Sequence, residues 1–354
     1  IIDQLVERRL QAKAAARLAP PGSGERFQLE ALSAAIKLVV NSGYGYLGAV
    51  GLTRFADVHA ANDITKRGRE LLSFMCRELG ARGVQLLEAD TDGVYFAVPG
   101  HFDDADERRV VAEVAALLPP LVELQFDGRY AAMLSHEPKN YALLPYDGPL
   151  VLRGVAFRSS RAEPFGEAFL RRALERLLQG DLVGVRAAYV ATVSDLRRRR
   201  LPTFDVCSRV RLTKTPAQYL LSREKRLELP YEALLAHGRE HWSVGERVYV
   251  YRRSMGRAGL WQAAEGDDND EPSSDRERDE RDYDAEHYVR QLQSSFASRL
   301  ARGVSADDFD AIVADPDRPS LFARSLATSH TVLDVLTAAI DEEPPPPLHS
   351  SGNR

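Results

Sequence analysis

The sequence predicts an α+β fold in which a helical hairpin precedes a short antiparallel sheet. Apolar residues recur at helical spacing through residues 1–18 and again through about 27–43, with the helix-breaking stretch "PPGSG" between them. A third helical pattern at 62–80 is followed by two apolar stretches within 83–99 that flank a tight turn. At 354 residues and 44% hydrophobic content, the chain is long enough for two or three modules that each bury a core.

The predicted helical hairpin carries cations at regular spacing. Arg9 and Lys13 are four residues apart and share one face of the first helix. Lys37, Asn41 and Tyr44 follow at i, i+4 and i+7, so they form one stripe on the second helix. The first pair by itself also fits a solvated charged face. The second stripe lies among serine and glycine residues that are poor helix formers, which favours a binding surface over a plain exposed face.

The next elements end in an acidic turn. We expect Asn62 to cap the helix at 62–80. The hairpin at 83–99 then presents Asp90 and Asp92 at its apex, and Gly93 supplies backbone freedom. A lone Asp-Thr-Asp turn is often only structural, because aspartate makes local hydrogen bonds in turns. A rigid hairpin with two carboxylates can also hold a hard cation such as Mg²⁺ beside a phosphate.

Several short motifs resemble those of a known family. The segment "KLVVNSGYG" at 37–45 matches K-x-x-x-N-S-x-Y-G, and "EADTDGVYF" at 88–96 resembles the D-T-D-S turn. Further along, "EPKNYALL" at 137–144 resembles K-K-x-Y, and "LRGVAFRSS" at 152–160 resembles K-G-x-x-x-x-R-R. These four motifs, in this order, resemble those of the family B DNA polymerases.

The resemblance continues through segments similar to the thumb of those polymerases, to about residue 302. These are "RVRLTKTPAQY", "SVGERVYVY" and "YDAEHYVRQLQSSFASRL", at residues 209–219, 243–251 and 283–300. The resemblance implies a right-hand polymerase with helical-hairpin fingers, a mixed palm with an antiparallel sheet, and a largely helical thumb. It implies fingers at 1–49, the C-terminal part of the palm at 50–163, a thumb at 164–340 with an acidic disordered insertion at 265–284, and a flexible tail at 341–354.

The resemblance also implies which residues of the fingers bind an incoming deoxynucleoside triphosphate. Arg9, Lys13 and Lys37 would neutralise the triphosphate charge, and Asn41 would accompany them. The two remaining residues implied for nucleotide binding, which would lie against the nascent base pair, are Tyr44 and Gly45.

In the palm, the resemblance implies that Asp92 is a catalytic metal ligand and that Asp90 supports it. The complete active site of the family would hold two Mg²⁺ ions. The residues implied to hold the primer–template DNA are Lys139, Tyr141, Arg153, Gly154 and, on the thumb, Lys214. Such contacts give salt-sensitive, sequence-independent affinity.

One motif of the family is absent from the sequence. Nothing matches D-x-x-S-L-Y-P-S, which would carry the partner metal-binding aspartate, and we expect the exonuclease and N-terminal domains of the family to be missing as well. The sequence also starts without methionine, so we expect a portion of a polymerase that is completed by an N-terminal part, on the same parent chain or on a separate polypeptide. We expect the chain alone to be inactive. The alternative is a non-catalytic DNA-binding remnant, and an exposed apolar palm surface would favour the incomplete polymerase.

Composition sets the remaining expectations. No apolar run approaches the roughly 18 residues of a membrane span, and no secretory signal is visible, so we expect no membrane and a cytoplasmic location, near the nucleoid in a bacterium. Cys76 and Cys207 alone make no disulfide framework. The net charge of −5 is concentrated in the acidic stretch at 265–284. The basic run "LRRRR" at 196–200 fits a phosphate-binding edge or a solvated helix end equally well.

Overall fold

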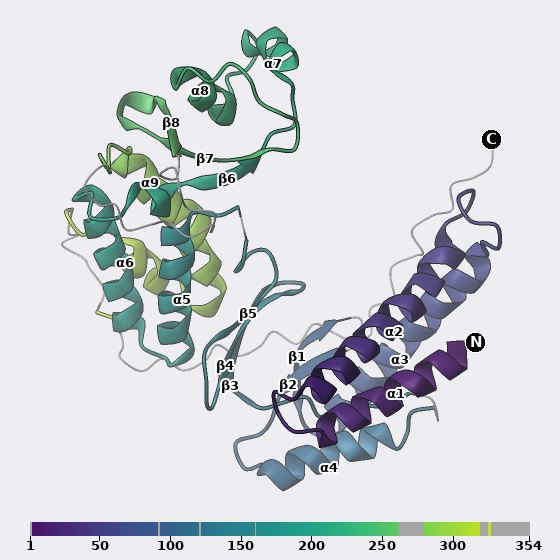
Figure 1. Cartoon of the computed structure of the whole chain (residues 1–354). Coiled ribbons are helices and arrows are strands. Elements are labelled where there is room, and N and C mark those ends of the chain that lie inside the picture. Colours follow the sequence, from purple (N-terminus) through teal and green to yellow (C-terminus); the bar gives the residue numbers. More distant parts are fainter. Residues whose placement is uncertain are drawn as a thin grey trace, which may run out of the picture. The chain divides into compact units, whose positions relative to one another are not determined.

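The computed structural model confirms the α+β class (Figure 1). It describes residues 2–90, 93–119, 122–159, 161–261, 279–318 and 325–326. Within these ranges the chain forms ten α-helices and three small antiparallel sheets. It divides into two compact units, one made of Ile1–Gln125 with Thr337–Arg354 and the other of Phe126–Leu336. Each unit is described by itself.

The first unit opens with the predicted helical hairpin, α1 (Ile2–Leu18) and α2 (Gly24–Gly48). Ser23 caps α2, because its hydroxyl accepts a hydrogen bond from the backbone N–H of Arg26 at 3.2 Å. Small side chains on α1 allow the helices to pack closely against Ile36, which is buried on α2.

The second helix is longer than predicted. The sequence pattern placed its end near residue 43, whereas α2 continues to Gly48. At Gly43, an added Cβ atom would lie 3.5 Å from the Cδ1 atom of Ile2 on α1. A glycine costs a helix only about 1 kcal/mol, so the glycines at 43, 45 and 48 are a weak signal for the end of the helix.

The rest of the first unit packs a hairpin against two helices. The helix α3 (Val58–Ala81) precedes β1 (Gln85–Asp90) and β2 (Gly93–Ala97), and α4 (Asp104–Ala115) follows them. The two strands pair antiparallel, as predicted, and their ladder ends where Asp90 lies opposite Gly93. The expected cap of the third helix was wrong. Asp57 caps it by accepting from the N–H of Ala60 at 3.0 Å, so the helix starts before Asn62. A buried apolar core joins these elements and includes Leu79, Val110 and Val114.

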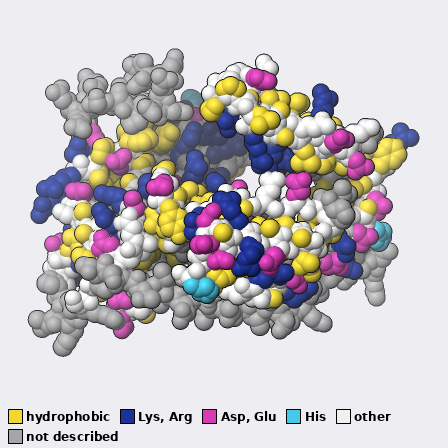
Figure 2. Space-filling model, turned by 90° about the horizontal axis from the view of Figure 1, so that it is seen from below, with side chains coloured by type: hydrophobic (Ala, Val, Ile, Leu, Met, Phe, Trp, Pro, Cys, Tyr) yellow, Lys and Arg dark blue, Asp and Glu magenta, His cyan; other side chains and the backbone are white. Residues whose placement is uncertain are grey.

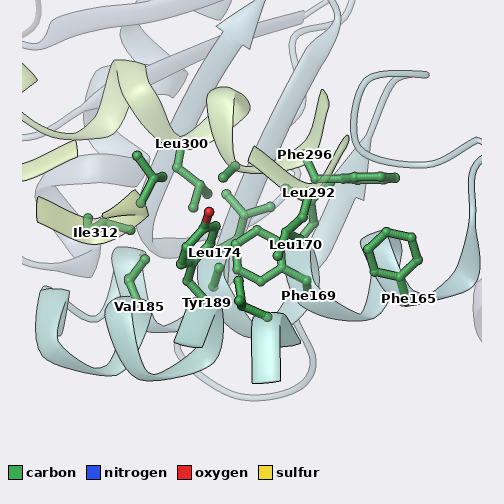
Figure 3. Close-up of a cluster of buried hydrophobic side chains, with 14 of the residues drawn as sticks. Phe165, Phe169, Leu170, Leu174, Val185, Tyr189, Leu292, Phe296, Leu300 and Ile312 are labelled. Carbon is green, nitrogen blue, oxygen red and sulfur yellow. The ribbon is translucent and has the colours of Figure 1, made fainter. Parts of the chain in front are cut away.

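The second unit contains a sheet beside a helical bundle. The strands β3 (Tyr130–Glu137), β4 (Asn140–Pro145) and β5 (Val151–Arg153) form an antiparallel sheet in that order. The helices of the bundle are α5 (Pro164–Leu178), α6 (Leu182–Arg197), α9 (Ala285–Gln291) and α10 (Ala306–Val313). Figure 3 shows their shared core, in which large apolar side chains converge from separate segments of the chain.

A second sheet lies within the region that was expected to be largely helical. Its strands are β6 (Ser208–Arg211), β7 (Arg247–Arg252) and β8 (Ala258–Trp261), in that order and antiparallel. The helices α7 (Pro216–Arg223) and α8 (Leu229–Ala236) accompany this sheet, and its apolar face shares a separate core with Tyr231 and Trp242. We call residues 208–261 the β6–β8 module.

Two features of the structure concern the expected domain limits, which stay predictions. The boundary between the compact units falls after Gln125, inside the segment 50–163 that was expected as one part of a palm. The last residues of the expected disordered insertion are ordered: Thr203 donates its backbone N–H to Asp279 at 2.8 Å, and Tyr283 is buried beside Arg253. These contacts override the high local charge. The rest of that insertion, and the expected tail at 341–354, lie outside the described residues.

Cysteine and membrane expectations can be examined only within the described ranges. Both cysteines are free and buried, and burial raises the pKa of each thiol. Among the helices described here, none combines the length and the apolar character needed to cross a bilayer.

A charged cluster in the second unit makes its stability depend on pH. Arg197 donates to both carboxylate oxygens of Asp315, at 2.7 and 2.9 Å, and to Glu286 at 2.8 Å. The hydrogen bonds from Arg197 hold the pKa of Asp315 well below its usual range. A lowered folded-state pKa stabilises the protein above the ordinary aspartate pKa of about 4, and this stabilisation is lost as the pH falls.

We therefore expect Arg197→Gln to lower the thermal midpoint at pH 7 and to lower it by less at pH 2.5, where the unfolded carboxylate is already protonated. Thermal unfolding of the wild type and the variant from pH 7 to pH 2.5 measures this difference. Arg176→Gln is the control, because Arg176 lies 3.7 Å from Asp181 and is largely exposed, so its ion pair contributes little at any pH. If the thermal midpoints of the wild type and Arg197→Gln differed by the same amount at both pH values, the pH-dependent stabilisation by Arg197 and Asp315 would be contradicted.

Candidate nucleotide and nucleic acid binding site

The helical hairpin brings its cations to one side. Lys13 directly follows Ala12, which is buried on α1, and Lys37 directly follows Ile36, which is buried on α2. One residue further along a helix is a rotation of about 100°. Lys13 and Lys37 are thus each rotated by the same angle from the buried face of their helix. Because α1 and α2 run antiparallel, these equal rotations bring both side chains to the same side of the hairpin. Arg17 follows buried Ala16 in the same way, a cation that the motif comparison missed.

Arg9 lies at the same level of the hairpin as the second stripe. Ile2 packs beside Gly43, so in the antiparallel hairpin Arg9, seven residues after Ile2, comes level with Ile36, seven residues before Gly43. Arg9 is half-buried, and its Nε atom is buried without a hydrogen-bond partner among the described residues. The guanidinium of Arg9 can therefore still donate a hydrogen bond from Nε to a ligand. Lys13 donates to the Oε1 atom of Gln125 at 3.3 Å.

The second stripe is open to a ligand. Lys37 and Asn41 are exposed, and in the described part of the chain neither side chain has a hydrogen bond or an ion pair. Tyr44 is 45% exposed, and an added Cβ atom at Gly45 would meet no atom within 4 Å. The side chains of this stripe are therefore not used for packing within the unit and remain accessible.

The acidic hairpin is described only in part. Asp90 closes the ladder of β1 and β2, whereas Asp92 lies outside the described residues. Within the described ranges, no three or more histidine, cysteine, aspartate or glutamate side chains are grouped so that they could hold a metal ion. Carboxylate oxygens suit Mg²⁺ in kind, but the described residues do not supply enough of them for a complete site.

A second cluster of predicted residues meets at one end of the β3–β5 sheet. Tyr141 on β4 lies directly opposite Arg153 on β5, and Lys139 occupies the turn before β4. Lys139 and Arg153 are both exposed, whereas the ring of Tyr141 is buried. The structure thus places two cations at the surface beside a tyrosine that packs inward.

The backbone around these cations is tightly fixed. Gly154 has φ +83° and Lys139 has φ +65°, both in the left-handed region. An added Cβ atom at Gly154 would overlap the carbonyl oxygen of Lys139 and the side chain of Asn140. Asn140 accepts a hydrogen bond from the N–H of Ala156 at 2.8 Å, so it ties the turn to the strand end.

Lys214 has a different environment from the other predicted DNA-binding residues. Its Nζ atom donates to Glu228 at 2.5 Å and to Ser222 at 3.2 Å. Its backbone carbonyl accepts the indole N–H of Trp242 at 2.9 Å. The ammonium group is therefore engaged inside the β6–β8 module.

The basic run at 196–200 also makes internal contacts. Arg197 binds the acidic groups named above, and Arg199 donates to Ser254 at 2.8 Å. Arg200 lies 3.6 Å from Asp195. At least these three arginines have partners within the second unit.

Exposed cations on a rigid hairpin and at a fixed sheet end are typical of a protein that binds the phosphates of nucleotides or nucleic acid. The model of DNA polymerase family B matches residues 1–302. The chain therefore belongs to DNA polymerase family B.

Individual relatives agree with this family. DNA polymerase 1 of Pyrococcus abyssi (strain GE5 / Orsay) is 30% identical over 174 residues, which are 48% of this chain and 22% of the relative. A DNA polymerase of Desulfurococcus sp. (strain Tok) is 26% identical over 289 residues, 78% of this chain and 35% of the relative. The structure of the family B DNA polymerase from Pyrobaculum calidifontis shares the fold, with a TM-score of 0.58, 21% identity and coverage of 86% of this chain and 37% of that chain. The chain thus spans well under half of these relatives.

Proposed function

We propose that the chain supplies the C-terminal fingers, palm and thumb portion of a DNA-directed DNA polymerase. The observation that carries this proposal is the hairpin on which Lys13 and Lys37 emerge on one side, with Arg9 level with the second stripe. Three cations spaced along one face can neutralise the charge of a triphosphate and of the leaving pyrophosphate. Asn41 and Tyr44 continue the face toward the position of the base.

The sheet end then holds the primer–template DNA. Lys139 and Arg153 are exposed beside each other, so their charges reach the phosphates of a duplex without reading its sequence. Tyr141 is buried and supports β4, the strand that follows the turn with Lys139. In this proposal its role is to position the cations.

The acidic hairpin contributes only part of a metal site. Asp92 and Asp90 would hold Mg²⁺ together with carboxylates from the polymerase part that carries D-x-x-S-L-Y-P-S. When bound, Mg²⁺ supplies charge neutralisation and activates the primer hydroxyl. The chain's own residues bind and orient the nucleotide and the duplex, and the chain by itself is inactive.

Exposed apolar side chains support the incomplete polymerase over the non-catalytic remnant. On the first unit, Phe27, Leu38, Leu52 and Phe55 are each at least 70% exposed. Figure 2 shows hydrophobic patches among the charged side chains on the face it draws. Apolar surface of this kind typically marks a site where another protein part packs. It lies on the helices and the loop after them rather than on the palm strands where we expected it.

Primer extension tests the proposal. With Mg²⁺ and all four deoxynucleotides, we expect extension only when the chain is mixed with the polypeptide encoded immediately upstream. Asp92→Ala in that mixture should lower the rate by roughly a thousandfold, because a metal ligand stabilises the transition state by several kcal/mol. Asp147→Ala removes an exposed carboxylate from a loop and serves as the control.

Two results would favour the remnant. One is the absence of primer extension in every mixture while the chain still binds duplex DNA in a salt-sensitive way. The other is equal extension by the wild-type and Asp92→Ala mixtures, which would remove Asp92 from the chemistry.

A further inference from the structure

The sheet of the β6–β8 module has two unlike faces. Side chains alternate along a strand, so every second residue of β6, β7 and β8 points to the same face. One face is apolar and packs into the core shared with α8; it includes Val210, Val248 and Leu260. Given the strand register, the residues of the opposite face include Arg209, Arg211, Arg247, Tyr249 and Trp261.

Two arginines on this opposite face are cross-strand neighbours. Arg211 on β6 pairs directly with Arg247 on β7. Side chains in such a pair have Cβ atoms about 5 Å apart, and like charges directly opposite destabilise a sheet. Both side chains are exposed, and neither forms an ion pair with any carboxylate in the part of the chain that the structure describes. The module therefore tolerates a repulsion that one neutral side chain would remove.

Arg209 extends the charged row toward an aromatic cluster. Its Nε atom is buried and has no hydrogen-bond partner within the described ranges, and its guanidinium carbon lies 5.8 Å from the ring centre of Tyr249. Phe204 lies next to Tyr249 and Trp261, with ring centres 5.3 and 4.7 Å away. All three rings are half-buried. A row of guanidinium groups beside aromatic rings is the combination with which sheets bind a nucleic acid strand.

We propose that this face binds the sugar-phosphate backbone of DNA, with Arg211 and Arg247 on neighbouring phosphates and Arg209 beside them. The inference rests on the proposed polymerase function and deepens it. The resemblance implied that Lys214 contacts a DNA phosphate, but Lys214 is paired with Glu228. In this inference, the three arginines make that phosphate contact in its place. A polyanion also resolves the repulsion between the paired guanidinium groups, which no carboxylate in the described residues offsets.

DNA binding by Arg211→Gln/Arg247→Gln tests this assignment. Fluorescence anisotropy of the full chain with a labelled primer–template duplex, and separately with a labelled oligo-dT strand, is measured from 50 to 300 mM salt. We expect about a tenfold loss of affinity at low salt for whichever DNA form binds the face. The slope of log affinity against log salt should become shallower by roughly 0.9 for each duplex phosphate that the variant no longer neutralises, or about 0.7 for each phosphate of a single strand.

Matched variants separate binding from stability. Arg226→Gln removes an exposed arginine from the same module, after α7, and should leave the slope unchanged. The thermal midpoint of the double variant should equal or exceed that of the wild type, because the change removes a like-charge pair.

Several outcomes would overturn the inference. One is a double variant with wild-type affinity and slope for both DNA forms, whether or not its midpoint falls. Another is displacement of DNA by polyglutamate as effective as by unlabelled DNA of equal charge, which would assign the face to an acidic protein. If the wild type binds neither DNA form, this inference and the proposed function both fail. If Lys139→Gln/Arg153→Gln weakens duplex binding while the Arg211/Arg247 double variant weakens binding of neither DNA form, only this inference fails.

Discussion

Gly154→Ala should destabilise the second unit by roughly 2–5 kcal/mol and weaken duplex binding. Two separate effects add at this position. The backbone has φ +83°, where a residue with a Cβ atom is strained, and the new methyl group would overlap the carbonyl oxygen of Lys139 and the side chain of Asn140. To relieve the overlap, the turn must move, and Lys139 and Arg153 move with it. Urea unfolding measures the change in the free energy of unfolding.

Gly148→Ala is the matched control for this prediction. Gly148 lies in the same unit with φ +105°, but an added Cβ atom there would meet nothing within 4 Å. It therefore has the strain without the overlap, and we expect a loss of about 1–2 kcal/mol. If Gly154→Ala cost no more than Gly148→Ala, the contact with Asn140 would have no energetic role in fixing the turn.

Leu174→Ala should destabilise the same unit by about 2–5 kcal/mol. Leu174 lies on α5, is 0% exposed, and is surrounded by the apolar side chains of the bundle (Figure 3). Removing its isobutyl group loses the transfer free energy of the buried atoms and leaves a cavity that close-packed neighbours fill only in part. Chemical denaturation followed by circular dichroism gives the free energy of unfolding.

Leu221→Ala makes the same chemical change at an exposed position. Leu221 lies on α7 and is 83% exposed, so we expect a change within about 0.5 kcal/mol. Equal losses in the two variants would show that the bundle core does not hold the unit together. An unchanged denaturant slope in both variants would confirm that the unfolding reaction itself is the same.

Local patterns in the sequence predicted the local elements well. Helical periodicity predicted α1 and most of α2, and alternation around the Asp-Thr-Asp-Gly stretch predicted β1 and β2. The errors are at element ends, where tertiary contacts compete with local preference. Gly43 packs beside Ile2 inside α2, which continues to Gly48, and Asp57 caps α3 five residues before Asn62.

For the candidate site, too, local sequence patterns predicted some features and tertiary contacts decided the others. Residues on one helix face, such as Lys37 and Asn41, follow from spacing alone, and the short motifs supplied their family. What each side chain contacts depends on partners distant in sequence. No local signal shows that Lys214 pairs with Glu228, or that Arg211 faces Arg247 across two strands. Such pairings depend on strand register and loop paths, which only the folded chain determines.

The bridge between Arg253 and Tyr283 has a consequence for which substitutions this part of the second unit can accept. Backbone hydrogen bonds continue the bridge on both sides, because Ser254 donates its N–H to the carbonyl of Asp282 at 3.0 Å and Asp284 donates its N–H to the carbonyl of Arg252 at 2.9 Å. Main-chain groups make these bonds, so they do not depend on the side chain at residue 253. A neutral residue at position 253 can therefore keep this link between the end of β7 and the start of α9, whereas the fully buried Tyr283 cannot be replaced as freely.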